Sequence, residues 1–302
     1  AKLACGVADT MLTCQALAFP GPLCLVPAMN PNLWHAPATQ ENVDRLRSRE
    51  NVTLLTPDEG DVACGDQGSG KLAPLIETYF QSLKTMTQQD MSGLKVVISL
   101  GATREFFDPV RFWSNPSSGR MGAALALTAW LRGADVTCVC GPSSIWLPRE
   151  VQRIDVVTAR DMLIACQDVW PSCDIGCLSA AVCDFRPEQT QEHKLKKNTV
   201  QSGLSIAFVP NPDILKTLGA QKQAGQRLIG FAAESDPAQL TAAKDKLKTK
   251  NLDLIAANVI NQPDTGFEHH TNAVLLMNAR GDHQELPVMS KADLAWTLWD
   301  WI

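Results

Sequence analysis

The sequence of 302 residues lacks the features that mark several large functional classes. No stretch reaches the about eighteen consecutive apolar residues of a membrane-spanning helix, so we expect no membrane partner. The net charge of −5 comes without a basic stripe, which argues against a nucleic-acid surface. Small molecules remain the expected partners, and we expect a cytoplasmic protein.

Several motifs with defined chemistry are also missing. The ten cysteines include no paired CxxC spacing, so buried thiols are favoured over disulfides or zinc. No G-x-G-x-x-G follows an expected strand, which argues against a dinucleotide-dependent oxidoreductase without excluding one. Residues 65–71 fit part of a P-loop, but Leu72 replaces the hydroxyl that binds magnesium, so we reject that reading. The cysteines inside apolar runs are Cys24, Cys138, Cys140, Cys166 and Cys177.

What the sequence does contain is a long polar loop between an apolar run and a helix. Residues 96–100 are typical of a buried parallel strand, and residues 123–131 are good helix formers with apolar spacing near 3.6. Small residues occupy the start of that helix, where unpaired backbone N–H groups and the positive dipole end favour an anion. They are Ser117, Ser118, Gly119 and Gly122. We predict a phosphate site, the alternative being an ordinary helix capped by Ser117.

The polar residues of this loop favour the binding interpretation. A connector of this length needs few charged side chains, so their density indicates a bound ligand. They are Thr103, Arg104, Glu105, Asp108, Arg111 and Asn115.

The motifs of this region and of two later segments resemble a known enzyme family. They are residues 101–105 (Gly-Ala-Thr-Arg-Glu), 108–112 (Asp-Pro-Val-Arg-Phe), 114–122 (Ser-Asn-Pro-Ser-Ser-Gly-Arg-Met-Gly), 180–186 (Ala-Ala-Val-Cys-Asp-Phe-Arg) and 194–197 (Lys-Leu-Lys-Lys). The chain resembles, over nearly its whole length, the bacterial bifunctional phosphopantothenoylcysteine decarboxylase/phosphopantothenate-cysteine ligase of coenzyme A biosynthesis. The resemblance implies that 4'-phosphopantothenate attacks CTP to give an acyl-cytidylate, from which the amine of cysteine displaces CMP.

The resemblance also implies roles for individual residues. Asn115 would orient the acyl-cytidylate, and Lys194 would support the first half-reaction from a lysine-rich segment that closes on polyphosphate. Lys246 and Lys250 would contact nucleotide phosphates, although cations at a helix C-terminus also have a structural explanation. The substrate phosphate would lie on Ser117, Ser118, Gly119 and Arg111. Arg120 stands where the family commonly has a lysine.

Strand ends in the second half of the chain carry further candidates for nucleotide binding. Asp184 can hold Mg²⁺ or bind the nucleotide, the alternatives being an N-cap or a partner of Arg186. Phe231 can stack on a base, although a core phenylalanine is the usual interpretation. A strand-to-helix segment can present backbone N–H groups to a phosphate or base. Its residues are Asn211, Pro212, Asp213 and Ile214.

The fold class is α/β, with two domains. Residues 85–93 are polar and lack periodicity, so we place a linker there, between domains at 1–84 and 94–302. In the first domain we expect a helix at 7–17, a strand at 23–28, a helix at 39–49 and a strand at 52–56. In the second, a Rossmann-like doubly wound domain, we expect strands at 95–100, 135–140, 153–157, 174–179, 204–209, 227–233 and 252–258, helices at 120–132, 160–168, 212–222 and 237–249, a hairpin at 274–287 and a last helix at 291–302.

By resemblance, the first domain is the C-terminal part of a flavodoxin-like, FMN-binding decarboxylase domain. Asn30 would hold the substrate carboxylate, and Cys64 would return a proton after decarboxylation. The alternatives are an Asx turn and a small buried side chain. The glycine-rich flavin loop and the histidine base of the family are not found, since His35 does not match that position. We therefore expect poor FMN binding and no decarboxylation by this chain alone.

Two other functional classes stay open. Tight NADH binding would favour the oxidoreductase, and oligomers without nucleotide turnover would favour a non-catalytic assembly remnant. An incomplete first domain suggests dependence on a partner, so we expect a homo-oligomer.

Overall fold

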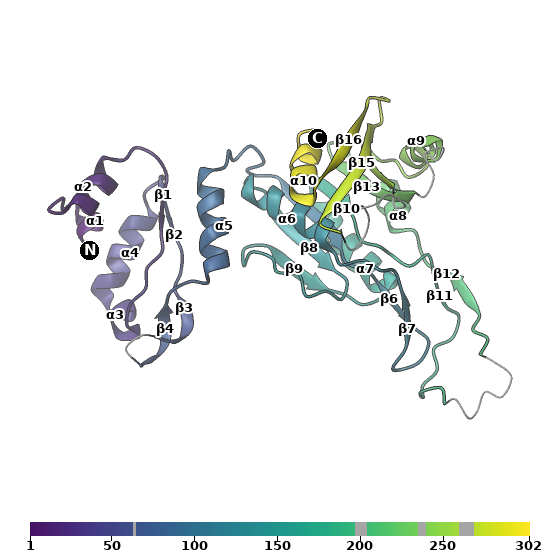
Figure 1. The fold of residues 1–302 in the computed structure, drawn as a ribbon, viewed down its shortest axis with the longest axis horizontal. Coiled ribbons are helices and arrows are strands. Elements are labelled where there is room, and N and C mark those ends of the chain that lie inside the picture. Colours follow the sequence, from purple (N-terminus) through teal and green to yellow (C-terminus); the bar gives the residue numbers. More distant parts are fainter. Residues whose placement is uncertain (63–64, 197–203, 235–239, 260–268) are drawn as a thin grey trace. The chain divides into compact units, whose positions relative to one another are not determined.

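The chain forms two compact units, Ala1–Gln89 and Asp90–Ile302. The computed structural model describes residues 1–302 except 63–64, 197–203, 235–239 and 260–268 (Figure 1). Within the described part, no helix combines the length and apolar character needed to cross a membrane.

The first unit alternates helices and strands around a two-stranded parallel sheet, in which Leu23 pairs with Val52. Its helices and strands are α1 (Lys2–Cys5), α2 (Met11–Ala18), β1 (Leu23–Leu25), α3 (Pro31–His35), α4 (Pro37–Arg47), β2 (Val52–Leu54), β3 (Asp58–Asp61), β4 (Gln67–Lys71) and α5 (Leu75–Met86). The helix expected from residue 7 starts later because the Thr10 side chain accepts a hydrogen bond from the Thr13 N–H and caps α2.

The β3–β4 hairpin and α5 were not predicted. Because β4 pairs antiparallel with β3, the segment that imitates part of a P-loop is mainly a hairpin strand. Helix α5 extends into the segment predicted as a linker.

The second unit is built on an eight-stranded sheet with the order β16-β15-β14-β13-β10-β5-β8-β9. The strands are β5 (Lys95–Leu100), β8 (Asp135–Cys140), β9 (Gln152–Asp155), β10 (Ile175–Leu178), β13 (Arg227–Glu234), β14 (Leu254–Val259), β15 (Thr271–Asn278) and β16 (His283–Ser290). The six strands from β14 to β9 pair in parallel, and β15 and β16 add antiparallel. The predicted doubly wound α/β fold is confirmed. Its strand order reverses between β5 and β10, where such sheets bind ligands at their carboxyl ends.

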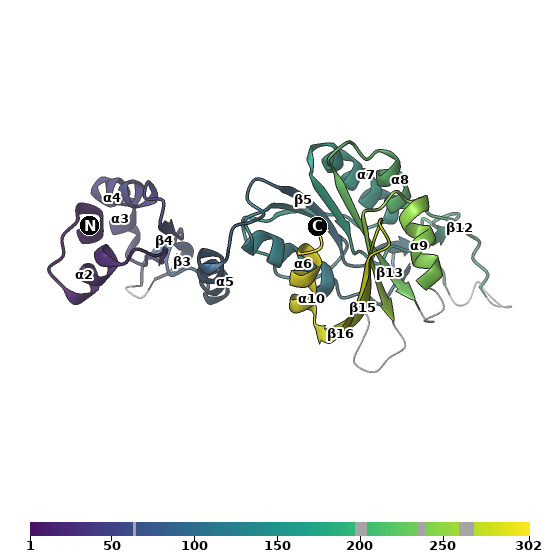
Figure 2. The same cartoon turned by 90° about the horizontal axis from the view of Figure 1, so that it is seen from above.

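Helices cover both faces of this sheet (Figure 2). They are α6 (Arg120–Leu131), α7 (Ala159–Val169), α8 (Ile214–Ala220), α9 (Leu240–Thr249) and α10 (Lys291–Trp299), with a 3₁₀ turn at Trp170–Ser172. Helices α6 and α10 pack together on one face, and α7 and α8 lie on the other. On the α7 side the core centres on Trp170 and Leu218, both fully buried, and the Trp170 indole N–H donates to the Leu218 carbonyl at 3.2 Å.

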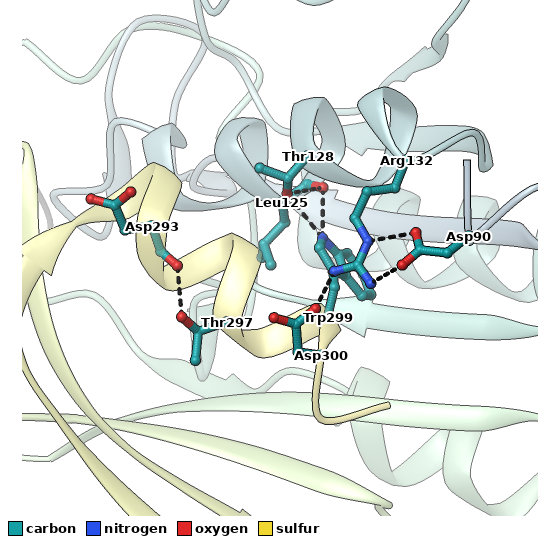
Figure 3. Close-up of polar contacts among 8 residues, drawn as sticks. All are labelled: Asp90, Leu125, Thr128, Arg132, Asp293, Thr297, Trp299 and Asp300. Atoms are coloured by element: carbon teal, nitrogen blue, oxygen red, sulfur yellow. Dashed lines mark hydrogen bonds and ion pairs between the residues drawn. The ribbon is translucent and has the colours of Figure 1, made fainter. Parts of the chain in front are cut away.

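The helices α6 and α10 are tied together near their C-terminal ends (Figure 3). The Trp299 indole N–H donates to the Leu125 carbonyl at 3.2 Å and to Thr128 Oγ1 at 3.0 Å. Arg132, 8% exposed, donates to both carboxylate oxygens of Asp90 at 2.9 and 2.7 Å and to Asp300 Oδ1 at 2.6 Å. Trp299 is 3% exposed, so its ring is part of the core between the two helices.

The strand predicted at 204–209 is wrong as a member of the main sheet. Only β12 (Phe208–Pro210) is a strand there, and it pairs antiparallel with β11 (Phe185–Pro187) in a separate hairpin. A second hairpin joins β6 (Arg104–Phe106) to β7 (Phe112–Ser114). The two hairpins meet where the Trp113 and Phe208 rings lie 5.7 Å apart, so the apolar side chains of this segment pack locally rather than in the sheet.

All six cysteines of the second unit are buried thiols, as predicted for cysteines inside apolar runs. Burial raises the pKa of Cys140 to about 11 and of Cys166 to about 12, so these thiols stay protonated and unreactive. Cys24 departs from the expectation because it is only partly buried. The buried cysteines are Cys138, Cys140, Cys166, Cys173, Cys177 and Cys183.

Candidate functional site

A cavity of about 600 Å³ opens at the carboxyl ends of β5, β10 and β13. It lies at the point where the strand order reverses, as expected for a ligand site in a doubly wound sheet. The predicted site residues that line it are Asn115, Ser117, Gly119, Asp184, Asn211, Pro212, Asp213, Ile214, Phe231, Lys246 and Lys250.

The start of α6 forms one wall of the cavity. Gly119, with φ at 76°, is the N-cap, so the alternative that placed the cap at Ser117 is wrong. A Cβ on Gly122 would lie 2.4 Å from Leu100 Cβ and 2.6 Å from Ser179 Oγ. These glycines allow the helix to pack directly on the strand ends, which brings its N–H groups to the cavity.

Asn115 connects the two loops that meet at the strand-order reversal. Its amide nitrogen donates to the backbone carbonyls of Val182 at 3.0 Å and Ala181 at 3.3 Å. Beside it, the buried Thr103 hydroxyl accepts from the Cys183 N–H at 3.0 Å. The loop after β5 is therefore fixed to the loop after β10, with the Asn115 side chain at the cavity surface.

The opposite wall comes from the segment before α8. The Asp213 carboxylate caps α8 by accepting from the Lys216 N–H at 3.0 Å and pairs with Lys250 Nζ at 2.8 Å. The Asn211 amide donates to the Cys183 carbonyl at 2.9 Å. Phe231 is half-buried and lines the cavity, so its ring is available to a planar base rather than enclosed in the core.

Asp184 is the carboxylate of this cavity that is open to a ligand. It is exposed, and no hydrogen bond or ion pair engages its side chain within the described part of the chain. Arg186, the alternative partner, instead donates to the Pro210 carbonyl and to Asn211 Oδ1. Among the described residues no cluster of three His, Cys, Asp or Glu side chains forms a metal site. One free carboxylate nevertheless fits Mg²⁺, which commonly binds through one or two carboxylates and substrate phosphates.

Three of the site residues predicted in the second unit do not line the cavity. Ser118 is half-buried beside it, and Arg111 instead lies 3.4 Å from Asp108. Lys194 is exposed on the segment that follows β11.

The segment that carries Lys194 is anchored at Asp108. This carboxylate is fully buried and accepts from the N–H groups of Val110 at 2.8 Å, Arg111 at 2.7 Å and Leu195 at 3.2 Å. Burial alone would raise the pKa of Asp108, but these hydrogen bonds hold it below the ordinary value. Asp108 thus remains ionised and fixes the position next to Lys194.

In the first unit, Asn30 adopts the Asx turn that was its structural alternative. Its Oδ1 accepts from the Asn32 N–H at 2.8 Å and caps α3, while its amide donates to Asp66. Its predicted role in holding a carboxylate stays a prediction. Cys64 lies outside the described residues.

Lys291 and Asn272 line the cavity but were missed. The Asn272 amide donates to Asn258 Oδ1 at 2.7 Å, which joins β15 to β14 at the rim. Lys291 is the first residue of α10 and only 6% exposed. The signal was present in the sequence, since a lysine directly after a helix-capping serine is unfavourable for the helix and calls for an explanation.

Comparisons with known proteins agree with this architecture. The family model for the DNA/pantothenate metabolism flavoprotein C-terminal domain matches residues 91–302, and the Flavoprotein model matches residues 1–82. The coenzyme A biosynthesis bifunctional protein CoaBC of Bacillus subtilis is 40% identical over 98% of this chain and 73% of that protein. A cysteine/cysteine sulfinic acid decarboxylase of an unknown prokaryotic organism is 37% identical over 97% of this chain and 82% of that protein.

A solved structure gives the same result for the second unit. The C-terminal domain of a CoaBC protein matches with a TM-score of 0.59 and 36% identity, over 70% of this chain and 95% of that domain. The resemblance inferred from the sequence motifs is confirmed. The chain belongs to the family of coenzyme A biosynthesis bifunctional proteins that carry a flavoprotein domain followed by a DNA/pantothenate metabolism flavoprotein C-terminal domain.

Proposed function

We propose that the second unit joins 4'-phosphopantothenate to cysteine in a CTP-dependent ligase reaction. The observation that carries this proposal is the cavity at the strand-order reversal, which combines a helix N-terminus, Asn115, a free carboxylate and the lysines Lys246 and Lys250. Membership of the bifunctional family supports the same activity.

In the first half-reaction, the carboxylate of 4'-phosphopantothenate attacks the α-phosphate of CTP and pyrophosphate leaves. Negative charge grows on the leaving group, so catalysis depends on cations and N–H groups fixed in advance around the phosphates. The start of α6, with Ser117 and Gly119, and the lysines Lys246 and Lys250 are suited to that task. Lys194 would reach the phosphates when its segment moves, with its base held at Asp108.

The nucleotide base would lie on the opposite wall. Phe231 offers a face for stacking, and Asn211 with the N–H groups from Pro212 to Ile214 offers polar contacts to the base or ribose. Mg²⁺ bound at Asp184 would neutralise charge on the triphosphate. CTP rather than another nucleotide is part of the proposal.

In the second half-reaction, the amine of cysteine attacks the acyl-cytidylate carbonyl and CMP leaves. The Asn115 amide nitrogen is engaged with the Ala181 and Val182 carbonyls. Its Oδ1 is an acceptor, so it can receive a hydrogen bond from the intermediate or from the incoming amine. This orients the two reactants without a protein nucleophile.

The first unit corresponds to the flavoprotein domain of the family, whose cofactor would be FMN. The Asn30 side chain is engaged within the unit through both its Oδ1 and its amide nitrogen. These contacts do not identify an FMN site, and we derive no decarboxylation step from this chain.

We also propose that the protein acts as a homo-oligomer in the cytoplasm. Aromatic side chains on the two hairpins support an assembly, since Trp113 is 56% exposed and Phe185 is 52% exposed. Sedimentation at several protein concentrations tests it, and a monomer throughout would contradict it.

The test of the ligase is the release of CMP and pyrophosphate from CTP, Mg²⁺ and 4'-phosphopantothenate, with and without cysteine. We expect cysteine-dependent amide formation by the wild-type chain. Asn115→Ala should lower it by roughly 100- to 1,000-fold, in the range found for removal of an orienting polar group. Asn32→Ala, on the exposed surface of α3 in the first unit, is the matched control and should keep full activity. The assignment of Asn115 would be contradicted if both variants lost the same amount of activity, or if Asn115→Ala formed the amide as fast as the wild type.

A further inference from the structure

The β6–β7 hairpin carries a buried carboxylate at an otherwise exposed turn. Asp108 is fully buried, whereas Pro109, Val110 and Arg111 are exposed. Its Oδ1 accepts from the Val110 N–H at 2.8 Å and from the Arg111 N–H at 2.7 Å, which closes the turn. Removing an ionised carboxylate from water is costly unless hydrogen bonds compensate, so its burial at this place needs a reason.

Closing the turn does not explain a buried charge, as another turn of the same unit shows. In the turn that joins β15 to β16, Asn278 Oδ1 accepts from the Arg280 N–H at 2.9 Å and from the Asp282 N–H at 3.0 Å. Asn278 is half-buried, and its neutral amide does there what Asp108 Oδ1 does in the β6–β7 turn. The reason for the carboxylate therefore lies with its second oxygen.

The second oxygen of Asp108 holds the segment that follows β11. This Oδ2 accepts from the Leu195 N–H at 3.2 Å. That N–H belongs to the peptide bond between Lys194 and Leu195, so the carboxylate fixes the main chain directly beside the lysine. Arg111 Nη1 lies 3.4 Å from the same oxygen, but the Arg111 side chain is 44% exposed, which makes this the weaker contact.

Two further hydrogen bonds fix the same segment to the same hairpin. Thr190 Oγ1 donates to the Phe106 carbonyl at 3.0 Å, and the Gln191 N–H donates to the Phe107 carbonyl at 3.0 Å. Of these three bonds, the one to the carboxylate lies next to the lysine and is assisted by charge.

The lysine beside this hydrogen bond has a flexible side chain. Lys194 is exposed, so its own side chain is not ordered by packing. Backbone and rotamer freedom are both lost when a lysine binds a phosphate, and a main chain that is already fixed lowers that cost. A hydrogen bond at the next residue thus favours the productive position of the ammonium group.

We propose that Asp108 is a positioning residue for the first half-reaction, which acts on Lys194 through the Leu195 N–H. This inference rests on the proposed ligase function. The carboxylate of 4'-phosphopantothenate bonds to the α-phosphate as the bond to the β-phosphate breaks, and Lys194 stabilises the charge that grows on the pyrophosphate. Asp108 makes no contact with the reactants and fixes only the main chain from which the lysine reaches them.

The test is Asp108→Asn, which separates the roles of the two oxygens. An asparagine Oδ1 can still close the turn, as Asn278 does, while its NH₂ group replaces Oδ2 and cannot accept from the Leu195 N–H. The reverse orientation of the amide would place the NH₂ group against two N–H donors, so it is less favourable. Asp282→Asn, the same change at an exposed turn, is the matched control.

The first measurement is limited trypsin digestion of the full chain, with cleavage after Lys194 followed by mass spectrometry. The cleaved peptide bond contains the N–H that Asp108 binds, so the rate reports the population in which this hydrogen bond is open. We expect cleavage of Asp108→Asn to be about ten- to a hundred-fold faster, as for loss of a hydrogen bond to a charged group. Asp282→Asn should match the wild type. Cleavage of a folded Asp108→Asn at the wild-type rate would overturn the inference.

The second measurement is a double-mutant cycle on the rate of pyrophosphate formation. Asp108→Asn should lower this rate about ten-fold, with the KM for 4'-phosphopantothenate within about two-fold of the wild type. In a Lys194→Gln background the same change should cost less than about two-fold, because a residue that acts through the lysine loses its effect once the lysine is gone. A raised KM for 4'-phosphopantothenate, or an equal loss in both backgrounds, would mean action through Arg111 or the turn and would overturn the inference.

A second pair of variants decides if Asp108→Asn does not fold. Leu195→Pro removes the N–H donor at a half-buried position and leaves the hairpin unchanged, so it should also slow pyrophosphate formation about ten-fold. Leu195→Ala keeps the N–H and is its control. Equal rates for these two variants, from a wild-type chain that forms pyrophosphate, refute this inference alone. A folded wild-type chain that forms no pyrophosphate refutes the proposed function.

Discussion

The same two helices, α6 and α10, meet different surroundings at their two ends. At their C-terminal ends, Arg132 lies between Asp90 and Asp300, so its charge is neutralised where a helix favours a cation (Figure 3). At their N-terminal ends, Arg120 and Lys291 lie together where a helix disfavours cations. At the C-terminal ends the charges are paired, as stable packing requires. At the N-terminal ends two cations lie where the helix dipoles disfavour them. The difference separates the part of this helix pair that holds the fold from the part that we propose binds the ligand.

The largest effect is expected on catalysis, from a change at the N-terminal end of α6. Arg120→Met should lower kcat/KM for CTP about 100-fold, equal to about 2.7 kcal/mol at 1.36 kcal/mol per tenfold. Its melting temperature should not fall, because this exposed side chain places a cation at a helix start, where the helix dipole disfavours it. Steady-state kinetics and thermal unfolding of the same preparation check both. A stable Arg120→Met variant with normal kinetics would contradict a functional role for the N-terminal end of α6.

The second prediction concerns the opposite end. Arg132→Met should lower the free energy of unfolding by about 2 kcal/mol, because two carboxylates lose a buried cation that bonds to both. Partial exposure of the Asp90 and Asp300 side chains keeps the loss below that of a fully buried pair. Urea unfolding measures this loss of free energy. The kcat/KM of the variant should stay within about three-fold of the wild type. An Arg132→Met variant that loses activity but keeps its stability would show that the C-terminal ends of the two helices also serve function.

A smaller effect is expected at the indole that connects the helices. Trp299→Phe keeps the buried aromatic volume but loses the hydrogen bonds to the Leu125 carbonyl and Thr128 Oγ1. We expect a loss of about 1 kcal/mol in unfolding free energy and no change in pyrophosphate affinity. Trp301→Phe, whose indole N–H donates to Gln284 near the surface, serves as control and should cost less.

The smallest effect is a dependence on pH. The hydrogen bonds from Arg132 lower the pKa of Asp90 below 3.8. A carboxylate with a lowered folded-state pKa stabilises the fold above its unfolded pKa, and this is lost as pH falls through the folded value. The stability gap between wild type and Arg132→Met should therefore narrow by up to about 1 kcal/mol from pH 6 to pH 3. A gap that stays constant over this range would mean that Asp90 does not carry the effect.

Much of the second unit could be predicted from the sequence because its signals are local. Continuous apolar runs such as residues 95–100 and 135–140 mark buried parallel strands, and β5 and β8 match them. The stretch at 204–209 failed because periodicity does not reveal a strand's partner, and β12 pairs with β11 outside the main sheet. The β3–β4 hairpin was missed because its strands are rich in glycine and acidic residues, which seldom form strands.

The site shows the same division. Residues in the connections that follow β5 and β10, such as Asn115 and Asp184, could be placed because the carboxyl ends of parallel strands meet at one edge of the sheet. The unfavourable position of Lys291 at a helix start was visible in the sequence, but its place at the cavity was not. It reaches the cavity only through the antiparallel addition of β15 and β16, which turns the last helix back to the rim. Asn30 was ambiguous in the sequence because an Asx turn and a binding side chain use the same atoms.

The most direct test of the ligase is rapid-quench detection of pyrophosphate and CMP from wild-type chain mixed with CTP, Mg²⁺ and 4'-phosphopantothenate, before and after addition of cysteine. We predict a burst of about one pyrophosphate per chain without cysteine, with CMP retained as the acyl-cytidylate until cysteine releases it. A folded chain that releases no pyrophosphate under these conditions, or releases CMP equally with and without cysteine, would contradict it.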